Sequence, residues 1–420
     1  MTEMAIQDLR TIGQKAKAAA RQMRLADAQA KNEALEEMAQ AIEAKAAQII
    51  EANQEDLAKG QEAGLTEALL ERLTLTPDRI QGMANGLRQM ASLPDPLLVT
   101  DKEWINRDGL RISRRRVPLG VIGIIYESRP NVTVDAAGLT LKAGNSTILR
   151  GGKEALTSNQ TIVAILQDAL AETQLPREAV QLITNPSRKL ASQFMQMNDY
   201  VDCLIPRGSA GLIQAVLKQA TVPVIETGEG NCHLYIHEAA DFDKALKILI
   251  NGKTQRPSVC NALENLIIDE QVASDYLPKF VDALAAHNVE VVGDHKACSI
   301  DRRIALAQEE DFAQEFLDLK LAVKITSSYA EAVEHIEAYS TGHSDAIITE
   351  NYQVAQDFMN DIDSAAVYVN ASTRFTDGEV FGFGGEIGIS TQKLHARGPM
   401  GLEALTSYKY TIQGDGQIRS

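Results

Sequence analysis

The 420-residue chain has no apolar run long enough to span a membrane, few cysteines and no excess of basic residues. Its first residues mix acidic and basic side chains without a long apolar core, which argues against a signal peptide or a membrane anchor. Four widely spaced cysteines in so long a chain favour reduced thiols in the cytoplasm over a disulfide framework. The formal charge of −16 argues against a nucleic-acid or anionic-membrane surface, so local cations must meet any anionic substrate.

Metal-ligand patterns are also missing. His295 and Cys298 are close in sequence, but no second ligand pair at a suitable spacing accompanies them. We therefore expect no metal site.

The length predicts two or three domains, each with its own core. Residues 6–90 have the apolar spacing of amphipathic helices, with a capping hydroxyl at Thr76 followed by Pro77. From Val117 onward, short apolar runs alternate with helical segments, which is typical of βαβ units with a parallel sheet. In the first such region, the predicted strands are residues 121–126, 146–149, 180–183, 201–205 and 222–225. In the second, they are residues 234–236, 265–268, 289–292, 321–325, 345–348 and 367–370.

Residues 104–117 interrupt this order. Their alternating pattern around Asp108 and Gly109 predicts a β-hairpin that projects as an arm. Its second half, residues 110–117, is the densest basic run; a solvated strand face in a subunit contact accounts for it better than an anion site does. The β-prone residues 404–412 are expected to pair with this arm, and we predict that a neighbouring subunit contributes that strand.

Two predicted strand ends have features of a phosphate site. One is followed by Arg150, Gly152 and Lys153, and the other by Gly208 and Ser209 at the start of a helix. Backbone N–H groups and a hydroxyl at such ends favour anion binding. The glycines do not form the dinucleotide-binding fingerprint, and ordinary turns explain them about as well.

Cys260 is the candidate nucleophile. It lies in residues 254–262, where Pro257 and Ser258 disfavour regular helix and Arg256 favours the thiolate form. The alternative for any intracellular cysteine is a buried, inert thiol.

Six segments spread over most of the chain resemble those of the γ-glutamyl phosphate reductases, also called glutamate-5-semialdehyde dehydrogenases, a branch of the aldehyde dehydrogenase superfamily. They are VPLGVIG at 117–123, ESRPNVT at 127–133, KAGN at 142–145, GGKEA at 151–155, GHSDAI at 342–347 and HARGPMGL at 395–402. The resemblance implies an aldehyde dehydrogenase-like α/β fold with a Rossmann-like NADPH-binding domain (1–102 and 119–228), an α/β catalytic domain (229–400) and a small β oligomerisation arm (103–118 and 401–420).

The resemblance also implies roles for individual residues. Cys260 occupies the position of the family nucleophile, and Asn131 is the candidate oxyanion donor, with Ser128 as the alternative. Glu226 occupies the position of the superfamily's general base, although the residues after it depart from the usual pattern. Glu315 matches the residue that holds the nicotinamide ribose, again with a departure in the residues that follow.

The implied reaction is the second step of proline biosynthesis, in which NADPH reduces γ-glutamyl phosphate to glutamate 5-semialdehyde with release of phosphate through a cysteine thioester. Arg256 is the candidate phosphate-binding cation and Ser128 a further substrate contact. The implied partners are the small-molecule substrate, glutamate 5-kinase and further copies of this chain. Two alternatives remain: a hydrolytic or coenzyme-A-acylating aldehyde dehydrogenase, and a catalytically silent scaffold of the same fold.

Overall fold

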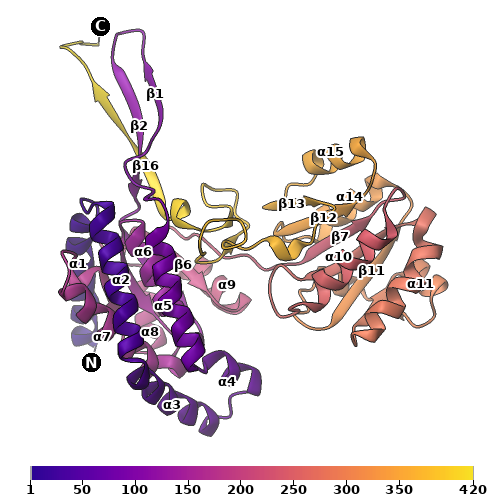
Figure 1. Cartoon of the computed structure of the whole chain (residues 1–420), viewed down its shortest axis with the longest axis horizontal. Helices are drawn as coiled ribbons and strands as arrows, with labels where there is room; N and C mark the ends of the chain where they lie inside the picture. The colour runs from indigo at the N-terminus through magenta and orange to yellow at the C-terminus, as the bar shows by residue number, and fades with distance from the viewer. Residues whose placement is uncertain (1, 420) are drawn as a thin grey trace. The chain divides into compact units, whose positions relative to one another are not determined.

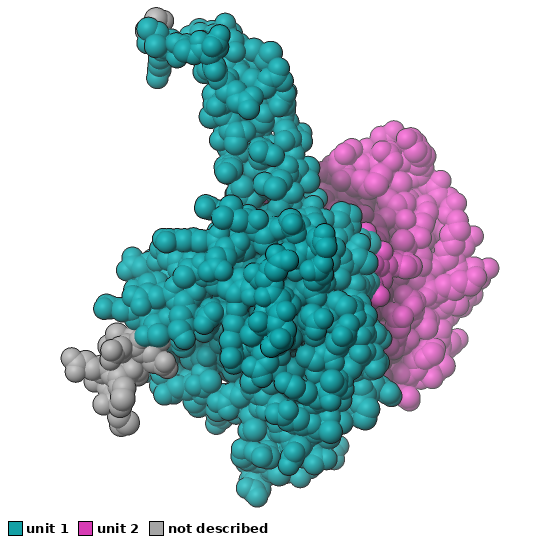
Figure 2. Space-filling model, turned by 60° about the vertical axis from the view of Figure 1, so that its left-hand side comes forward, with its two compact units in different colours: residues 1–227, 382–388, 400–420 teal, residues 228–381, 389–399 magenta. Residues whose placement is uncertain are grey.

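The computed structural model describes residues 2–419, with side chains described for residues 9–67 and 69–419. The chain forms two compact units, coloured teal and magenta in Figure 2. Unit 1 comprises residues 1–227, 382–388 and 400–420, and unit 2 comprises residues 228–381 and 389–399. Residues 382–388, which the sequence analysis placed with the catalytic segment, thus pack with unit 1. No helix in the described residues is long and apolar enough to cross a membrane.

Unit 1 begins with five helices, which confirms the helical prediction for residues 6–90. They are α1 (Thr2–Met23), α2 (Ala28–Ala44), α3 (Ala46–Glu62), α4 (Glu67–Leu73) and α5 (Pro77–Ser92). The predicted cap is present, since the Thr76 hydroxyl accepts a hydrogen bond from the Arg79 N–H at 3.2 Å and Pro77 is the first helical residue. This cap satisfies one of the amide donors that a helix start leaves unpaired.

A four-stranded parallel sheet of order β5-β4-β3-β6 forms the centre of unit 1. Its strands are β3 (Val121–Tyr126), β4 (Ser146–Arg150), β5 (Val180–Leu182) and β6 (Cys203–Arg207), and its helices are α6 (Asn131–Lys142), α7 (Leu156–Ala171), α8 (Arg188–Phe194) and α9 (Ala210–Gln219). Apolar side chains of α1 and α8 pack on one face of the sheet. Helices α6 and α7 cover the other face, and α2, α3 and α5 pack on these two helices in turn (Figure 1). The predicted βαβ pattern is confirmed.

The strand predicted at residues 222–225 is not formed. A single bridge joins Leu204 to Val224 next to β6. Pro223 has no N–H to donate to a neighbouring strand, which explains why this apolar run does not extend the sheet.

The predicted arm is confirmed as a three-stranded antiparallel sheet with β2 in the centre (Figure 1). Its strands are β1 (Thr100–Ile105), β2 (Arg111–Pro118) and β16 (Thr406–Gln413). Because β16 belongs to the same chain as β2, the prediction that a neighbouring subunit supplies this strand is wrong. The basic run is largely neutralised inside the arm: Arg111 pairs with Glu103 at 2.7 Å, and Arg114 pairs with Asp101 at 3.3 Å.

Unit 2 is built on a seven-stranded parallel sheet of order β10-β9-β11-β8-β7-β12-β13. Its strands are β7 (Cys232–Ile236), β8 (Leu263–Asp269), β9 (Glu290–Gly293), β10 (Ala305–Leu306), β11 (Lys320–Thr326), β12 (Ser344–Ile348) and β13 (Ala366–Val369). Its helices are α10 (Phe242–Thr254), α11 (Glu270–Ala286), α12 (His295–Ile300), α13 (Glu309–Ala313), α14 (Tyr329–Tyr339) and α15 (Tyr352–Asp361), and a short ribbon joins β14 (Ile389–Ser390) to β15 (Gly398–Pro399).

Both faces of this sheet are buried. Along β7, Leu234 and Ile236 belong to the core cluster that includes residues of α10 and α11, whereas Tyr235 belongs to the cluster that includes residues of α14 and α15. Successive side chains of a strand point to opposite faces, so a strand covered on both sides reads as an unbroken apolar run. This is why all six strands predicted in this region are confirmed, whereas the two-residue β10 has no such signal.

One buried ion pair crosses the layers of unit 2. Lys253, near the end of α10, lies 2.6 Å from Glu264, the second residue of β8, and both side chains are fully buried. Burial raises the pKa of Glu264 and lowers that of Lys253. The Lys253 ammonium group also donates to the Leu263 carbonyl at 2.7 Å. The pair therefore joins the two ends of the loop formed by residues 255–262.

Replacing Lys253 with Met should leave the Glu264 carboxyl buried without its partner, and we expect the opening free energy of β8 to fall by about 3 kcal/mol or more. Native-state hydrogen exchange of the β8 amides measures this quantity. Lys279→Met, which removes an exposed ion pair with Asp275, is the matched control and should change little. The double variant Lys253→Met/Glu264→Gln should recover some of the loss, and an unchanged single variant would contradict the role of the pair.

Candidate active site

Cys260 lies on the loop between α10 and β8, and its side chain is half-buried. The neighbouring strands β7 and β12 run parallel to β8 in the same sheet, and they begin at Cys232 and Ser344. The loop therefore lies at the amino edge of the unit 2 sheet. Ligands of open parallel sheets usually bind at the opposite, carboxyl edge.

A glycine allows a close backbone contact with Cys260. A Cβ atom on Gly230 would overlap the carbonyl group of Cys260 and lie 2.6 Å from its Cα atom. The Cys232 thiol donates to the same Cys260 carbonyl at 3.2 Å. Residues 230–232, which we call the platform, thus pack directly against the backbone of the candidate nucleophile.

Buried hydrogen bonds hold this platform in place. The Asn231 side chain donates to the carbonyls of Phe312 and Tyr339 at 2.7 and 2.8 Å and accepts from the Asn265 amide at 2.7 Å. The Gly230 N–H donates to the Glu315 carboxylate at 2.8 Å. Glu315, predicted to hold the nicotinamide ribose, is therefore a backbone anchor here, and burial raises its pKa.

The other three cysteines are poor nucleophile candidates. Burial raises the pKa of Cys203 to about 12 and that of Cys232 well above its ordinary value. The pKa of Cys298 is also raised by burial. Because the thiolate is the reactive form, these shifts oppose nucleophilic chemistry at all three positions.

Sequence reasoning missed a second segment that contacts the nucleophile loop. The short 3-10 helix Thr373–Phe375 follows β13, and the Thr373 hydroxyl donates to the Asn261 carbonyl at 2.8 Å. The Asn261 amide donates in return to the carbonyls of Arg374 and Thr376, at 3.4 and 2.9 Å. Arg374 is thereby placed close to Cys260 although it is distant in sequence. Arg256, predicted as the phosphate-binding cation, is exposed on the loop itself.

The predicted cofactor residues of unit 1 lie at the carboxyl ends of β4 and β6. At the start of α9, the Ser209 N–H donates to the Glu127 carboxylate at 2.8 Å, and a Cβ on Gly208 would collide with the same group. The anion that this helix start meets in the structure is therefore an internal carboxylate. Arg150 donates to the Pro186 carbonyl at 3.0 Å, and Lys153 is exposed in the first turn after β4.

Glu154, in the same turn after β4, is a second internal carboxylate. It accepts hydrogen bonds from both the Ser128 N–H, at 2.9 Å, and the Ser128 hydroxyl, at 2.7 Å. Ser128 has a φ of +37°, a left-handed value that these two bonds help to hold. A Cβ on Gly152 would also collide with the Glu154 carboxylate. The Ser128 hydroxyl is thus already engaged within unit 1.

The remaining predicted catalytic residues also belong to unit 1. Asn131 begins α6, and its amide donates to Asp135 at 3.2 Å, one turn along the helix. Burial raises the pKa of Asp135 to about 6. Glu226 is half-buried just before the boundary between the two units.

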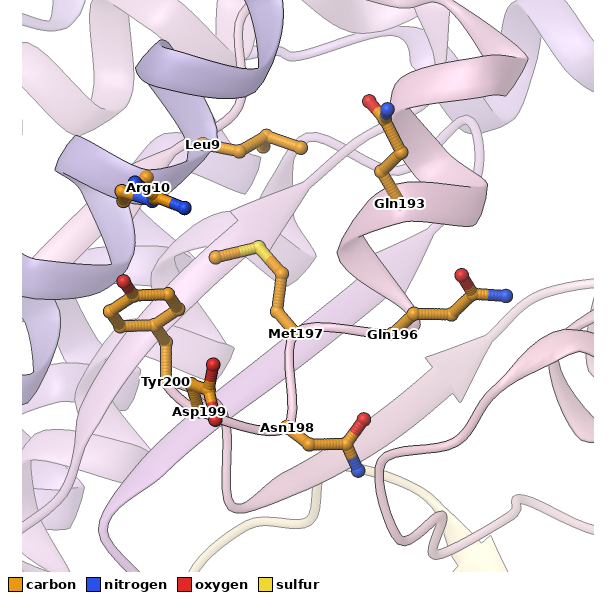
Figure 3. Close-up of a pocket in the computed structure, with 8 residues that line it drawn as sticks. All are labelled: Leu9, Arg10, Gln193, Gln196, Met197, Asn198, Asp199 and Tyr200. Atoms are coloured by element: carbon orange, nitrogen blue, oxygen red, sulfur yellow. The ribbon is translucent and has the colours of Figure 1, made fainter.

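A surface pocket in unit 1 is a separate feature. It is lined by Leu9 and Arg10 of α1, Gln193 of α8 and residues 196–200 (Figure 3). Residues 196–200 precede β6, so the pocket lies at the amino end of that strand. It is therefore distinct from the strand ends that hold Lys153 and Ser209.

Comparisons with known proteins agree with this arrangement. Residues 1–314 match the model of the aldehyde dehydrogenase family. The γ-glutamyl phosphate reductase of Enterococcus faecalis is 54% identical over 99% of this chain and 100% of its own length. That of Heliobacterium modesticaldum is 56% identical over 97% of this chain and 98% of its own.

Solved structures show the same relationship. The crystal structure of γ-glutamyl phosphate reductase from Thermotoga maritima has a TM-score of 0.96 and 47% identity, covering 98% of this chain and 100% of that one. An acetylating aldehyde dehydrogenase from Geobacillus thermoglucosidasius, at 19% identity, has a TM-score of 0.70 over 99% of this chain and 98% of its own, and shares the fold. The predicted fold class and family are confirmed: the chain belongs to the aldehyde dehydrogenase family and, within it, to the γ-glutamyl phosphate reductases.

Proposed function

We propose that this chain reduces γ-glutamyl phosphate to glutamate 5-semialdehyde with NADPH, releasing phosphate, as the second step of proline biosynthesis. The observation that carries the proposal is the half-buried Cys260 thiol, on a loop that Gly230 contacts on one side and Thr373 binds on the other. The full-length similarity to γ-glutamyl phosphate reductases supports it. A nucleophile in a fixed backbone converts attack on a bound acyl phosphate into an intramolecular step.

The proposed step at Cys260 is acyl transfer. The thiolate sulfur forms a bond to the acyl carbon, and the bond from that carbon to the phosphate oxygen breaks with its electron pair, which leaves a thioester and free phosphate. An oxyanion donor stabilises the charge that develops on the carbonyl oxygen, and Asn131 remains our candidate; Ser128, the alternative, has to release Glu154 before its hydroxyl can donate. Release of phosphate needs no activated water, so Glu226 is not required as a base in this direction.

NADPH, when bound, supplies the hydride that reduces the thioester. The residues of unit 1 fit such a group, because Lys153 is exposed at the carboxyl end of β4, where folds that use NAD usually place a carboxylate for the ribose hydroxyls. We assign cofactor binding to Arg150, Gly152, Lys153, Gly208, Ser209 and Glu315. In this assignment Lys153 meets the 2′-phosphate.

Further copies of this chain are the proposed partners at the arm. β1 and β16 each pair with β2 alone among the described strands, so each has one unpaired edge. Ile105, Tyr410 and Ile412 are 63, 51 and 55% exposed on these strands. Unpaired edges with exposed apolar side chains favour association. Glutamate 5-kinase, which would supply a reactive acyl phosphate, is a second proposed partner, and we infer a cytoplasmic location.

The reverse reaction tests the function. With glutamate 5-semialdehyde and NADP, the chain should form NADPH beyond one equivalent per enzyme only when inorganic phosphate is present, because hydride transfer leaves a thioester on Cys260 that must be released to phosphate. Cys260→Ser should abolish the reaction without changing the circular dichroism spectrum, since a hydroxyl is a far weaker nucleophile near pH 7. Rapid formation of free glutamate without phosphate would instead support a hydrolytic enzyme with Glu226 as base, and dependence on coenzyme A would support an acylating one.

Gly230→Ala tests the platform beneath Cys260. The new methyl group would overlap the Cys260 carbonyl, so the loop has to move, and we expect turnover to fall by about a hundredfold. Gly82→Ala in α5, where the new methyl group would meet no atom beyond its own helix backbone and chain neighbours within 4 Å, is the control and should keep full turnover. Wild-type turnover in Gly230→Ala would show that this contact does not position the nucleophile.

Lys153→Glu tests the cofactor assignment. A carboxylate at this position should repel the 2′-phosphate and shift the ratio of kcat/KM for NADPH over NADH toward NADH by about tenfold or more. Lys218→Glu, on an exposed residue in the last turn of α9, makes the same charge change elsewhere in unit 1. If both variants keep the wild-type ratio, another residue binds the 2′-phosphate.

A further inference from the structure

Arg374 is attached to the nucleophile loop through its backbone and its side chain. Its carbonyl accepts from Asn261, the residue after Cys260, and its Nε donates to Gln255 near the start of the same loop, at 3.1 Å. The adjacent residue Thr373 binds the loop as well. The guanidinium group therefore moves with the segment that holds the nucleophile.

This guanidinium group is partly buried, and no ion pair joins it to any of the described carboxylates. Arg397, from the same unit, instead pairs with Asp363 at 2.8 Å. Burial lowers the pKa of Arg374 and the nearby Arg256 lowers it further, whereas the Cys260 thiolate and the Asp377 carboxylate act in the opposite direction. Two cations thus lie near one another, with the thiol close to Arg374, and their mutual repulsion favours the binding of a further anion beside the single Asp377 carboxylate.

The geometry of a guanidinium fork suits a phosphoryl group. With Nε directed at Gln255, the two terminal nitrogens can contact two oxygens of one anion. A phosphoryl group carries close to two negative charges and matches two arginines, whereas a carboxylate carries one. Long-range attraction cannot supply this recognition, because the chain has a net charge of −16.

The chemistry of the substrate decides which of its anionic groups reaches this position. In an acyl phosphate, the phosphorus is separated from the attacked carbonyl carbon by one oxygen atom. The α-carboxylate of a glutamyl group is separated from that carbonyl carbon by three further carbon atoms. A cation close to Cys260, as Arg374 is, is therefore better placed for the phosphoryl group than for the α-carboxylate.

We propose that Arg374, together with Arg256, forms the receptor for the phosphoryl group that Cys260 displaces. The proposal rests on the function proposed above and adds a residue that sequence reasoning did not find. Arg374 holds the leaving oxygens while the carbon–oxygen bond breaks and the electron pair departs with the phosphate. In reverse, it binds inorganic phosphate for attack on the thioester.

The test measures KM values in the reverse reaction, with inorganic phosphate, NADP and glutamate 5-semialdehyde each varied. Arg374→Ala should raise the KM for phosphate by about tenfold to a hundredfold, with little change in the KM for NADP. Arg374→Lys keeps the charge but loses the fork, and should give an intermediate value. Arg302→Ala, an exposed arginine elsewhere in unit 2, is the matched control and should match the wild type.

Each other outcome is decisive. A wild-type enzyme that needs no phosphate overturns the proposed function, whereas a phosphate-dependent wild type with an unchanged KM in both Arg374 variants overturns this inference alone. A rise in the KM for the semialdehyde instead of phosphate would mean that Arg374 binds the α-carboxylate, which also overturns it. If the Ala variant is poorly folded, Arg374→Lys still provides the comparison, and recovery of Arg374→Ala by added guanidinium would support the receptor.

Discussion

The buried pair of Lys253 and Glu264 is the constraint on which the nucleophile loop depends. It joins the end of α10 to the start of β8, so the intervening residues 255–262 form a short loop with fixed ends. A buried ion pair of this kind need not add net stability compared with an apolar pair, but losing one partner is costly. Because Cys260 lies inside the closed segment, the same pair that holds the helix to the sheet also limits where the thiol can lie.

The acidic groups that flank this loop have partners within unit 2, so positive charge predominates next to Cys260. The Glu264 carboxyl is paired with Lys253, and Glu315 accepts the Gly230 N–H. Burial raises the pKa of both acids, which further reduces the negative charge near the thiol. Among the described cations around the loop, the guanidinium groups of Arg256 and Arg374 are then left without an ion-pair partner, while the nearby Asp377 carboxylate accepts the N–H groups of Glu379 and Val380. A thiolate and an anionic substrate are both favoured there, although the chain as a whole is strongly acidic.

Local chemistry explains which features the sequence predicted. The hairpin follows from Asp108 and Gly109, and the strands of unit 2 follow from unbroken apolar runs, because both signals lie within a few residues. Cys260 was found because a cation and turn-forming residues surround it in sequence. The apolar residues 222–225 were predicted to form a strand, but Pro223 has no backbone N–H to donate, and only a single bridge forms there.

What the sequence did not predict depends on contacts between distant residues. Glu127 fills the start of α9 from 82 positions earlier, and Arg374 reaches the Cys260 loop through a turn 113 positions after Asn261. Neither contact leaves a periodic pattern. The first depends on the parallel neighbours β3 and β6 ending at one edge, whereas the second depends on the segment after β13 turning back to the amino edge, where Thr376 is hydrogen-bonded to Ser344 at the start of β12. The two sheets differ in which edge is used: candidate cofactor residues follow the carboxyl ends of β4 and β6, whereas Cys260 precedes β8. Cys260 is followed closely by β8, and the pairing of β8 with its neighbouring strands holds the end of the loop in place. The amino edge of the sheet therefore suits a residue whose position must not vary.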